Sequence, residues 1–457
     1  MGWSIRSDAF HPDVETLKMS IYFKRRLLEM GIDMEKKKQL SCPQCQEIII
    51  KDHGFVAWCD KCNWNVKPEE NKEPKTLFEK IYLKAGKRSS EKMLSLMIQN
   101  GELLPKVTFQ KIITLCFSAL VHILSFGLLL SGIYLIIAMY PFILPMLFGL
   151  LLVFIAWATR PIGYKLTAKP LSREQFPVTY QIVDEISSLF NTKKVYGIII
   201  NGEFNASFAQ VGFKRKKIMH LGLPLISILK KQELVSLISH ELAHGINGDL
   251  NRSIFIGSAM STLSRWYQMI KPARLYETLE FTAIIALFMI PVNLFLLLVS
   301  KLIYMYLYCI CQLDWLDSQR AEYMADNHAV MISGKDAKLA MLDKLHLDSL
   351  FDFSIQKTIN NPNSNPLLDE FQNQVAQIPS KELERIRRLN LMSNSKLDVT
   401  HPPTVNRISY INSLKDNPAK YQLTDELYNH FIVEISSLRS NIEKKIINDY
   451  KKNVLGW

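Results

Sequence analysis

The sequence predicts a mainly α-helical protein with a small β-sheet, in which a membrane-embedded core follows a small metal-binding module. Three observations support this fold class. A helix over Lys231–Asp249 carries two histidines four residues apart, residues 112–157 contain almost no charge, and four cysteines near the N-terminus form two C-x-x-C pairs. The first pattern is typical of a metal site on a helix, the second of a pair of membrane helices, and the third of a zinc ribbon.

The composition is that of a protein with both membrane and water-exposed parts. Of the 457 residues, 48% are hydrophobic and 21% are charged, and the length leaves room for two or three domains. The net charge of +12 suits an anionic lipid surface or a nucleic acid. The basic excess is spread along the chain, so we expect the lipid bilayer to be the partner and nucleic acid not to be. The first 40 residues contain no apolar run as long as a secretory signal needs.

The N-terminal part is predicted to be a helical segment over residues 1–39, with its helix around Val14–Met30, followed by a zinc ribbon over residues 40–66. Two C-x-x-C pairs separated by 13 residues define the ribbon, Cys42 with Cys45 and Cys59 with Cys62. Four thiolates close a tetrahedral structural zinc site.

Between the cysteine pairs, Glu47–Lys51 and Phe55–Trp58 are expected to form the two strands of a hairpin. A pair of disulfides is the alternative to zinc, but it requires an oxidising compartment, which the lack of a signal sequence disfavours. Zinc ribbons serve protein-binding, nucleic-acid-binding and purely structural roles. A protein partner or substrate recognition through the ribbon therefore stays open.

Residues 67–111 are predicted to be a charged helical connector, and residues 112–158 a transmembrane helical hairpin. Ile112–Met139 exceeds the roughly 20 residues needed to cross a bilayer, and Pro141–Trp157 is just long enough. Basic residues flank the hairpin on both sides and none lies at its turn, so the positive-inside rule places both ends in the cytoplasm. The ribbon and the histidine helix then share one reducing compartment.

Residues 159–412 are predicted to form the metal-binding domain. A helix over Arg173–Phe190 and strands over Val195–Ile200 and Ile218–Leu221 precede the histidine helix. A strand just before such a helix can offer its edge to an extended peptide, main chain to main chain. An ordinary sheet without that role is compatible with the same pattern.

The histidine helix contains His240-Glu241-Leu242-Ala243-His244, the pattern H-E-x-x-H. Apolar residues recur near helical spacing along it, so one face is predicted to be buried. Residues four apart share a helix face, so the imidazoles of His240 and His244 converge on one point. Glu241 lies close enough on the helix to reach a water between them. Two neutral histidines and a neighbouring carboxylate are what a catalytic Zn²⁺ needs.

An apolar insertion around residues 253–311 follows the histidine helix. Its main run, Phe281–Cys311, has 31 residues, fewer than the roughly 40 that two crossings require. Either a pair of crossings that also uses residues 253–262 or a bent hairpin lying partly in the membrane accounts for it.

A third metal ligand is sought in Asp317–Ala329, which is helical by pattern and carries Glu322 and Asp326 four residues apart. Glu322 lies 78 residues after His244. The spacing alone does not select it, because a helix with two acidic residues on one face is usually only solvated.

HELAHGINGD followed by S-x-R-A-E-Y-x-A-D resembles the HtpX-type membrane metallopeptidases and their CAAX prenyl protease relatives. The resemblance implies a zincin-type metallopeptidase core of the gluzincin class. In such a core His240, His244 and Glu322 bind the catalytic zinc and Glu241 is the general base.

The resemblance extends to supporting residues over about two-thirds of the chain, from the first membrane hairpin to Tyr410. Asp249 and Asp326 match the family's two aspartates behind the metal, and Asn205-Ala206 resembles the element before its substrate-binding edge strand. Thr400–Thr404 with Arg407 resembles the late H-P-P-T…R motif, which implies that His401 steadies the substrate or the oxyanion. One departure is Gln319, where the family usually has arginine. The ribbon is outside the common family pattern.

If Glu322 is a ligand, it lies on the same side of the membrane as His240. Residues 250–315 then cross the bilayer an even number of times, and a membrane-embedded hairpin is favoured over a single span.

The expected function is therefore that of a membrane-bound zinc endopeptidase with one catalytic and one structural Zn²⁺. It is expected in a bacterial cell membrane as a multi-pass protein, with its ribbon and active site facing the cytoplasm and with membrane or misfolded proteins as substrates. A CAAX-type prenyl-protein protease would need a larger membrane chamber than two to four spans provide. A non-enzymatic zinc-ribbon adaptor has no use for Glu241. Residues 413–457 are predicted to be helical and to pack on the core or extend from it.

Overall fold

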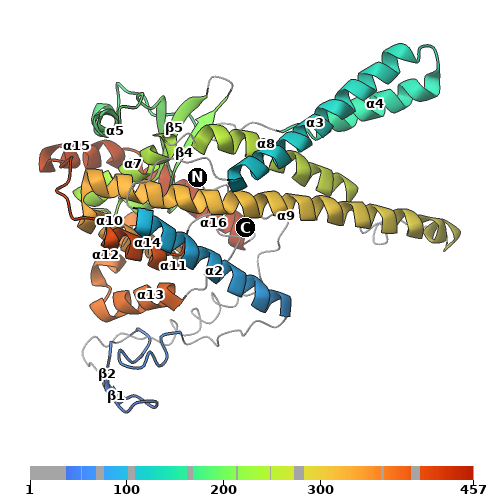
Figure 1. Cartoon of the computed structure of the whole chain (residues 1–457). Coiled ribbons are helices and arrows are strands. Elements are labelled where there is room, and N and C mark those ends of the chain that lie inside the picture. Colours follow the sequence, from blue (N-terminus) through green and yellow to red (C-terminus); the bar gives the residue numbers. More distant parts are fainter. Residues whose placement is uncertain are drawn as a thin grey trace.

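A computed structural model of the chain describes residues 38–52, 54–67, 77–100, 109–161, 168–212, 215–246, 249–271, 283–361, 365–392 and 402–455. The predicted helix around Val14–Met30 and the predicted functional residue His401 lie outside these ranges. The described part is mainly helical with two small sheets, as the sequence predicts. Figure 1 shows a helical body, a ribbon on one side of it, and long helices that project from the other side.

The ribbon hairpin pairs β1 (Lys38–Ser41) antiparallel with β2 (Ile48–Lys51), so that Ser41 lies opposite Ile48. The Cys42–Cys45 knuckle therefore forms the turn of the hairpin. The prediction of a strand over Phe55–Trp58 is wrong, because β1, which precedes the first cysteine pair, pairs with β2 instead. Residues 55–58 instead run as irregular chain that buries Trp58.

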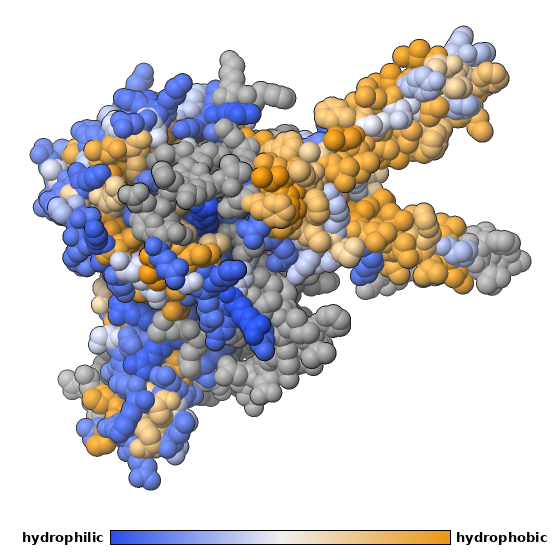
Figure 2. Space-filling model, in the orientation of Figure 1, coloured by the Kyte–Doolittle hydropathy of each residue, from blue (hydrophilic) through white to orange (hydrophobic). Residues whose placement is uncertain are grey.

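The predicted membrane hairpin consists of α3 (Phe109–Ala138) and α4 (Ile143–Ala158). The two helices touch where glycines face each other, since a Cβ on Gly132 would lie 2.7 Å from the carbonyl oxygen of Gly149. The start of α3 lies at the body, α4 ends part-way along α3, and the turn of the hairpin points away from the body (Figure 1). Its outer surface is almost wholly apolar (Figure 2).

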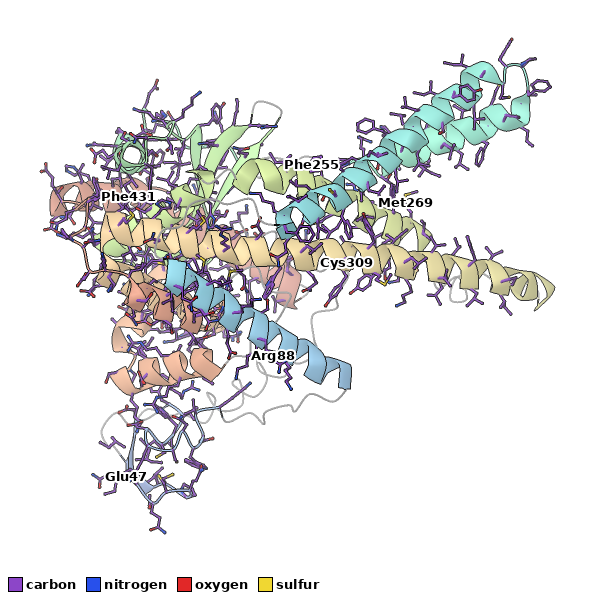
Figure 3. All side chains as sticks on the ribbon, in the orientation of Figure 1. Glu47, Arg88, Phe255, Met269, Cys309 and Phe431 are labelled. Carbon is purple, nitrogen blue, oxygen red and sulfur yellow. The ribbon has the colours of Figure 1, made fainter. Side chains whose placement is uncertain are left out.

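A second helical pair is formed by α8 (Asp249–Ile270) and α9 (Ala283–Ser333), which lie side by side around Tyr304 and Ile310. The α9 helix continues for 51 residues through Pro291 and into the body. Figure 3 marks Phe255 and Met269 on α8 and Cys309 on α9. On α3, His122 Nε2 lies 3.1 Å from the Phe255 carbonyl oxygen and thus links the first hairpin to α8.

Among the described residues, two helices are long and apolar enough to cross a membrane by length and composition, namely α3 and the part of α9 that starts at Ile290. α4 is apolar but shorter.

The body is built around a three-stranded sheet with the order β3-β5-β4. Its strands are β3 (Gly197–Asn201), β4 (Ala206–Val211) and β5 (Lys216–Gly222). β5 is parallel to β3 and antiparallel to β4, so β4 is an edge strand. Residues 195–200 and 218–221 were predicted as strands, and both are confirmed to within a few residues.

Helices surround this sheet and enclose one hydrophobic core. Those before and after the histidine helix are α5 (Pro177–Leu189), α6 (Leu223–Ile226), α10 (Lys335–Lys344), η2 (Leu345–Leu347), α11 (Asp348–Asn360) and α12 (Leu367–Gln377). The C-terminal helices are α14 (Thr404–Ser413), α15 (Asp425–Ser436), α16 (Arg439–Tyr450) and η3 (Lys451–Leu455). Phe431, Ile435 and Ile446 belong to the same core as α5 and the sheet, so the C-terminal helices pack on the body.

Two further helices connect the body to the ribbon side. The connector contains α2 (Leu77–Asn100), whose Met97 packs against Tyr323 and Tyr410. The ribbon lies against α13 (Ser380–Met392). Arg388 Nη1 donates to the Asp60 carbonyl oxygen at 2.7 Å, and Arg385 Nη1 donates to that of Val66 at 3.1 Å. In Figure 3, Glu47 marks the end of the ribbon that is far from the body.

Candidate metal centre

The two histidines of the H-E-x-x-H pattern lie on α7 (Lys231–Ile246), whose apolar face is buried through Leu234, Leu237, Ile238 and Leu242. One helical turn separates His240 from His244, and their ring centroids are 4.9 Å apart. Both imidazoles are buried. The α9 helix packs along α7 and brings Glu322 to the same place.

The three side chains present a donor set of the right size for zinc. His240 Nε2 lies 3.4 Å from Glu322 Oε2, and His244 Nε2 lies 3.4 Å from Glu322 Oε1. A tetrahedral zinc with ligands about 2.1 Å away holds neighbouring ligand atoms about 3.4 Å apart. Burial lowers the pKa of His244 to about 3, so its imidazole is neutral at pH 7 and keeps a lone pair for a metal.

Glu241 is buried beside His240 on the same helix. It lies next to the donor set but is not part of it, because the atoms within 4.8 Å of one another come from His240, His244 and Glu322. A carboxylate in this place is suited to take a proton from a water that reaches the centre.

Behind the donor set lies a cluster of buried charges around Asp326. His240 Nδ1 lies 3.1 Å from Asp326 Oδ1. Arg407 grips both carboxylate oxygens, with Nε donating to Oδ2 at 2.8 Å and Nη2 donating to Oδ1 at 2.6 Å. Burial alone would lower the pKa of Arg407, but the Asp326 carboxylate raises it above its ordinary value. An Nδ1–H that donates to Asp326 fixes the tautomer of His240 that presents Nε2 to a metal.

Other predicted site residues fall near the centre or outside the described part. Asn205 lies directly before β4 and Ala206 begins it. The prediction that the strand just before the histidine helix offers its edge is wrong, because that strand, β5, lies between β3 and β4. β4 lies close to α7, since a Cβ on Gly245 would be 2.6 Å from Phe208 Cε1. Asp249 begins α8, but its side chain is outside the described part, as is the whole of His401.

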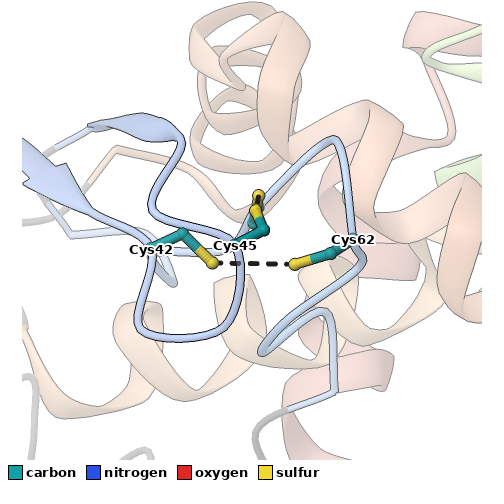
Figure 4. A group of neighbouring side chains, drawn as sticks. Cys42, Cys45 and Cys62 are labelled. Atoms are coloured by element: carbon teal, nitrogen blue, oxygen red, sulfur yellow. Dashed lines mark hydrogen bonds between the residues drawn. The ribbon is translucent and has the colours of Figure 1, made fainter.

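The four cysteines of the ribbon converge in a second group (Figure 4). Cys42 Sγ lies 3.6 Å from Cys62 Sγ, and Cys45 Sγ lies 3.5 Å from Cys59 Sγ. A tetrahedral zinc with thiolates about 2.3 Å away spaces them about 3.8 Å apart, so this group also fits zinc. Both sulfur–sulfur distances are much longer than the roughly 2.05 Å of a disulfide bond.

Two buried polar residues near the centre did not follow from sequence reasoning. Lys338 on α10 is fully buried, with Nζ 2.9 Å from Asp326 Oδ1. Its sequence context is a charged helix, in which a lysine is expected to be solvated. Gln319 is 1% exposed, and within the described residues its amide atoms have no hydrogen-bond partner.

Residues 180–415 match the model of peptidase family M48, and this range covers just over half of the chain and includes the whole donor set. The chain belongs to peptidase family M48. Family M48 peptidases are zinc-dependent, which agrees with the chemistry of the three donors. The predicted resemblance to the HtpX-type metallopeptidases is confirmed.

Two relatives of this M48 chain carry the description "Protease HtpX homolog". The one from Pyrobaculum calidifontis is 22% identical over 244 residues, which cover 52% of this chain and 68% of the relative. The one from Pyrobaculum islandicum is 24% identical over 293 residues, which cover 60% of this chain and 78% of the relative. These likenesses support a protease and do not name its substrates.

Proposed function

We propose that this M48 protein is a membrane-anchored zinc endopeptidase that hydrolyses peptide bonds of membrane or misfolded proteins on the cytoplasmic side. The observation that supports it most is the buried donor set of His240, His244 and Glu322 at tetrahedral spacing, with Glu241 beside it. A scaffold or adaptor would gain nothing from a buried carboxylate next to three metal ligands, because burying a charge costs free energy.

In the proposed mechanism His240, His244 and Glu322 hold the catalytic zinc. When bound, zinc polarises a peptide carbonyl and lowers the pKa of water. Glu241 accepts the proton of the attacking water and passes it to the leaving amine. His240 Nδ1 faces Asp326 Oδ1 at 3.1 Å, and Arg407 holds Asp326 in that position. We assign His401 to steadying the substrate or the oxyanion, on family resemblance.

The substrate is proposed to bind along β4. This edge strand lies beside α7, and among the described strands only β5 pairs with it, on one of its edges. An extended peptide that pairs with β4 would gain main-chain hydrogen bonds with little dependence on its sequence. Such binding suits a protease that degrades many unfolded segments.

The membrane is proposed to hold the α3–α4 hairpin and the α8–α9 pair. Side chains on α3 and α4 are exposed and apolar to an extent that is unusual for a surface in water, such as Leu144 at 81% and Phe126 at 64%. Figure 2 shows apolar surface over both projecting arms and polar surface over the body. Lys111 lies in the first turn of α3 and Arg160 follows α4, and by the positive-inside rule these charges support a cytoplasmic body.

The test is a cleavage assay on the full chain purified in detergent, with casein as a generic unfolded substrate. We expect cleavage that a zinc chelator abolishes and added Zn²⁺ restores. Cleavage that persists after the metal of the His240 site has been removed would contradict a zinc endopeptidase. A metal-loaded protein that cleaves neither casein nor a membrane protein would favour the adaptor alternative.

A further inference from the structure

Lys338 is a buried lysine that the proposed mechanism does not use. It lies on α10, which packs against both α7 and α9, and its side chain is completely buried. Burying an ammonium group removes its hydration and costs free energy unless an opposite charge meets it. The only ion-pair partner of Lys338 within the described residues is Asp326.

The contact falls on one particular oxygen of Asp326. Lys338 Nζ lies 2.9 Å from Oδ1, the oxygen that is also 3.1 Å from His240 Nδ1. Arg407 Nη2 donates to this oxygen at 2.6 Å as well. Three nitrogen atoms that can act as hydrogen-bond donors therefore surround Oδ1, and one of them belongs to His240, a proposed metal ligand.

Arg407 and Lys338 contact different sets of carboxylate oxygens within this cluster. Arg407 binds both oxygens of Asp326, and its Nη1 also lies 3.6 Å from Glu322 Oε2. Lys338 contacts Oδ1 alone. Arg407 is therefore shared between Asp326 and Glu322. Lys338 meets only the Asp326 oxygen that faces His240.

We propose that Lys338 is a positioning residue of the metal centre, which acts through Asp326 Oδ1 to hold the His240 imidazole with Nε2 toward the metal. This inference rests on the proposed metal-dependent function, because it assigns Lys338 to that same centre. It adds α10 to the elements that shape the site. Mutating a residue that hydrogen-bonds to a metal-binding histidine typically lowers metal affinity or activity roughly 10- to 100-fold.

The same helix supplies a matched control. Lys344 pairs with Glu233, which lies in the first turn of α7 and accepts a hydrogen bond from the Lys230 amide. Lys344→Met therefore removes a lysine of α10 that also contacts the zinc helix, but at the end that carries no ligand.

The experiment measures the affinity of the full chain in detergent for Co²⁺ and Zn²⁺ after substitution Lys338→Met. Co²⁺ bound to thiolates has charge-transfer bands that report the ribbon separately. We expect the dissociation constant at the His240 site to rise roughly 10- to 100-fold, while the ribbon site is unchanged. Lys344→Met should leave both sites as they are in the parent. An unchanged His240 site in Lys338→Met would overturn the proposal.

A comparison in the Asp326→Asn background shows whether Lys338 acts through Asp326. Residues that act as one unit are not additive, so the double variant should bind metal no more weakly than Asp326→Asn alone. A further drop in the double variant would overturn the proposal. This comparison also serves if Lys338→Met does not fold, because the double variant has no buried carboxylate left at position 326.

The metal readout separates this inference from the proposed function. If the parent binds metal but cleaves no protein, the effect of Lys338→Met on affinity is still measured. If the parent is a peptidase and Lys338→Met binds metal like the parent, only the role of Lys338 fails.

Discussion

At the scale of single residues, the metal centre consists of buried side chains, and each of them holds a neighbour in place. His240 presents one ring nitrogen to the donor set and the other to Asp326, so its tautomer follows from its neighbours. Asp326 in turn depends on Arg407 and Lys338. Each link replaces water that the buried groups have lost, which is why no member can be changed alone without cost.

Buried histidines away from the centre make stability depend on pH. Burial lowers the pKa of His220 on β5, with Glu203 opposing it, and burial likewise lowers that of His346. The unfolded chain takes up these protons near pH 6.5 and the folded chain only at lower pH. Their contribution to stability is therefore fully present above about pH 6.5 and is lost as the pH falls through the lowered values.

We accordingly expect the free energy of unfolding in detergent to fall between pH 7.5 and 5.5. A denaturant titration at several pH values measures this. His220→Asn should flatten the slope, since asparagine does not titrate. A stability that rises toward pH 5.5, or a slope unaffected by His220→Asn, would contradict the account.

At the scale of elements, the sequence predicted where the helices lie better than which segments pair or join. The periodicity of apolar residues correctly placed α7, and the uncharged apolar runs correctly placed α3 and α4. Two strands of the sheet also lie where they were predicted. β1 was missed because a four-residue strand of mixed polarity has no periodicity to detect, and only pairing with Ile48–Lys51 defines it. The apolar run after Phe281 and the helix with Glu322 were expected as separate elements, but α9 runs through both as one continuous helix.

For the site, the sequence supplied the three proposed ligands and the proposed base, but Glu322 only by resemblance. Two acidic residues four apart look like an exposed face, and only the packing of α9 on α7 turns them inward. Lys338 escaped for the same reason, because a lysine in a charged helix gives no sign of burial. The contact between α10 and Asp326 is tertiary, so no local pattern reports it.

The contact between β4 and α7 should be sensitive to a single methyl group. A Cβ on Gly245 would come within 2.6 Å of Phe208 Cε1, so Gly245→Ala forces the edge strand away from the zinc helix. We expect a loss of about 1–3 kcal/mol in stability from overpacking and a rise in the KM for casein. Gly127→Ala is the matched control, since nothing lies within 4 Å of a Cβ there. Unchanged KM and stability in Gly245→Ala would argue against a close β4–α7 contact.

At the scale of the whole molecule, the two metal sites belong to different packing units. The ribbon has its own small core around Cys42, Ile49 and Cys59, separate from the large core of the body. It attaches to the body through polar contacts from Arg385 and Arg388 of α13. The apolar arms project from a different side of the body (Figures 1 and 2). This layout predicts that the ribbon can lose its metal without unfolding the body.

Cys42→Ser with Cys45→Ser tests this independence. Two of four thiolates are then missing, so the bound zinc should fall from two ions per chain to one, as measured by native mass spectrometry. The ion at His240, His244 and Glu322 should remain, and the thermal unfolding of the body should change little. Loss of both ions would show that the two sites fold as one unit.

The most direct test of the central claim is Glu241→Gln. Glutamine keeps the size of the side chain but cannot accept a proton, so the variant should retain two zinc ions per chain and cleave casein roughly 10²- to 10⁴-fold more slowly than the parent. Glu174→Gln changes an exposed glutamate and should cleave at the parent rate. Cleavage by Glu241→Gln at the parent rate, with its zinc in place, would contradict the assignment of Glu241 as the general base of a zinc peptidase.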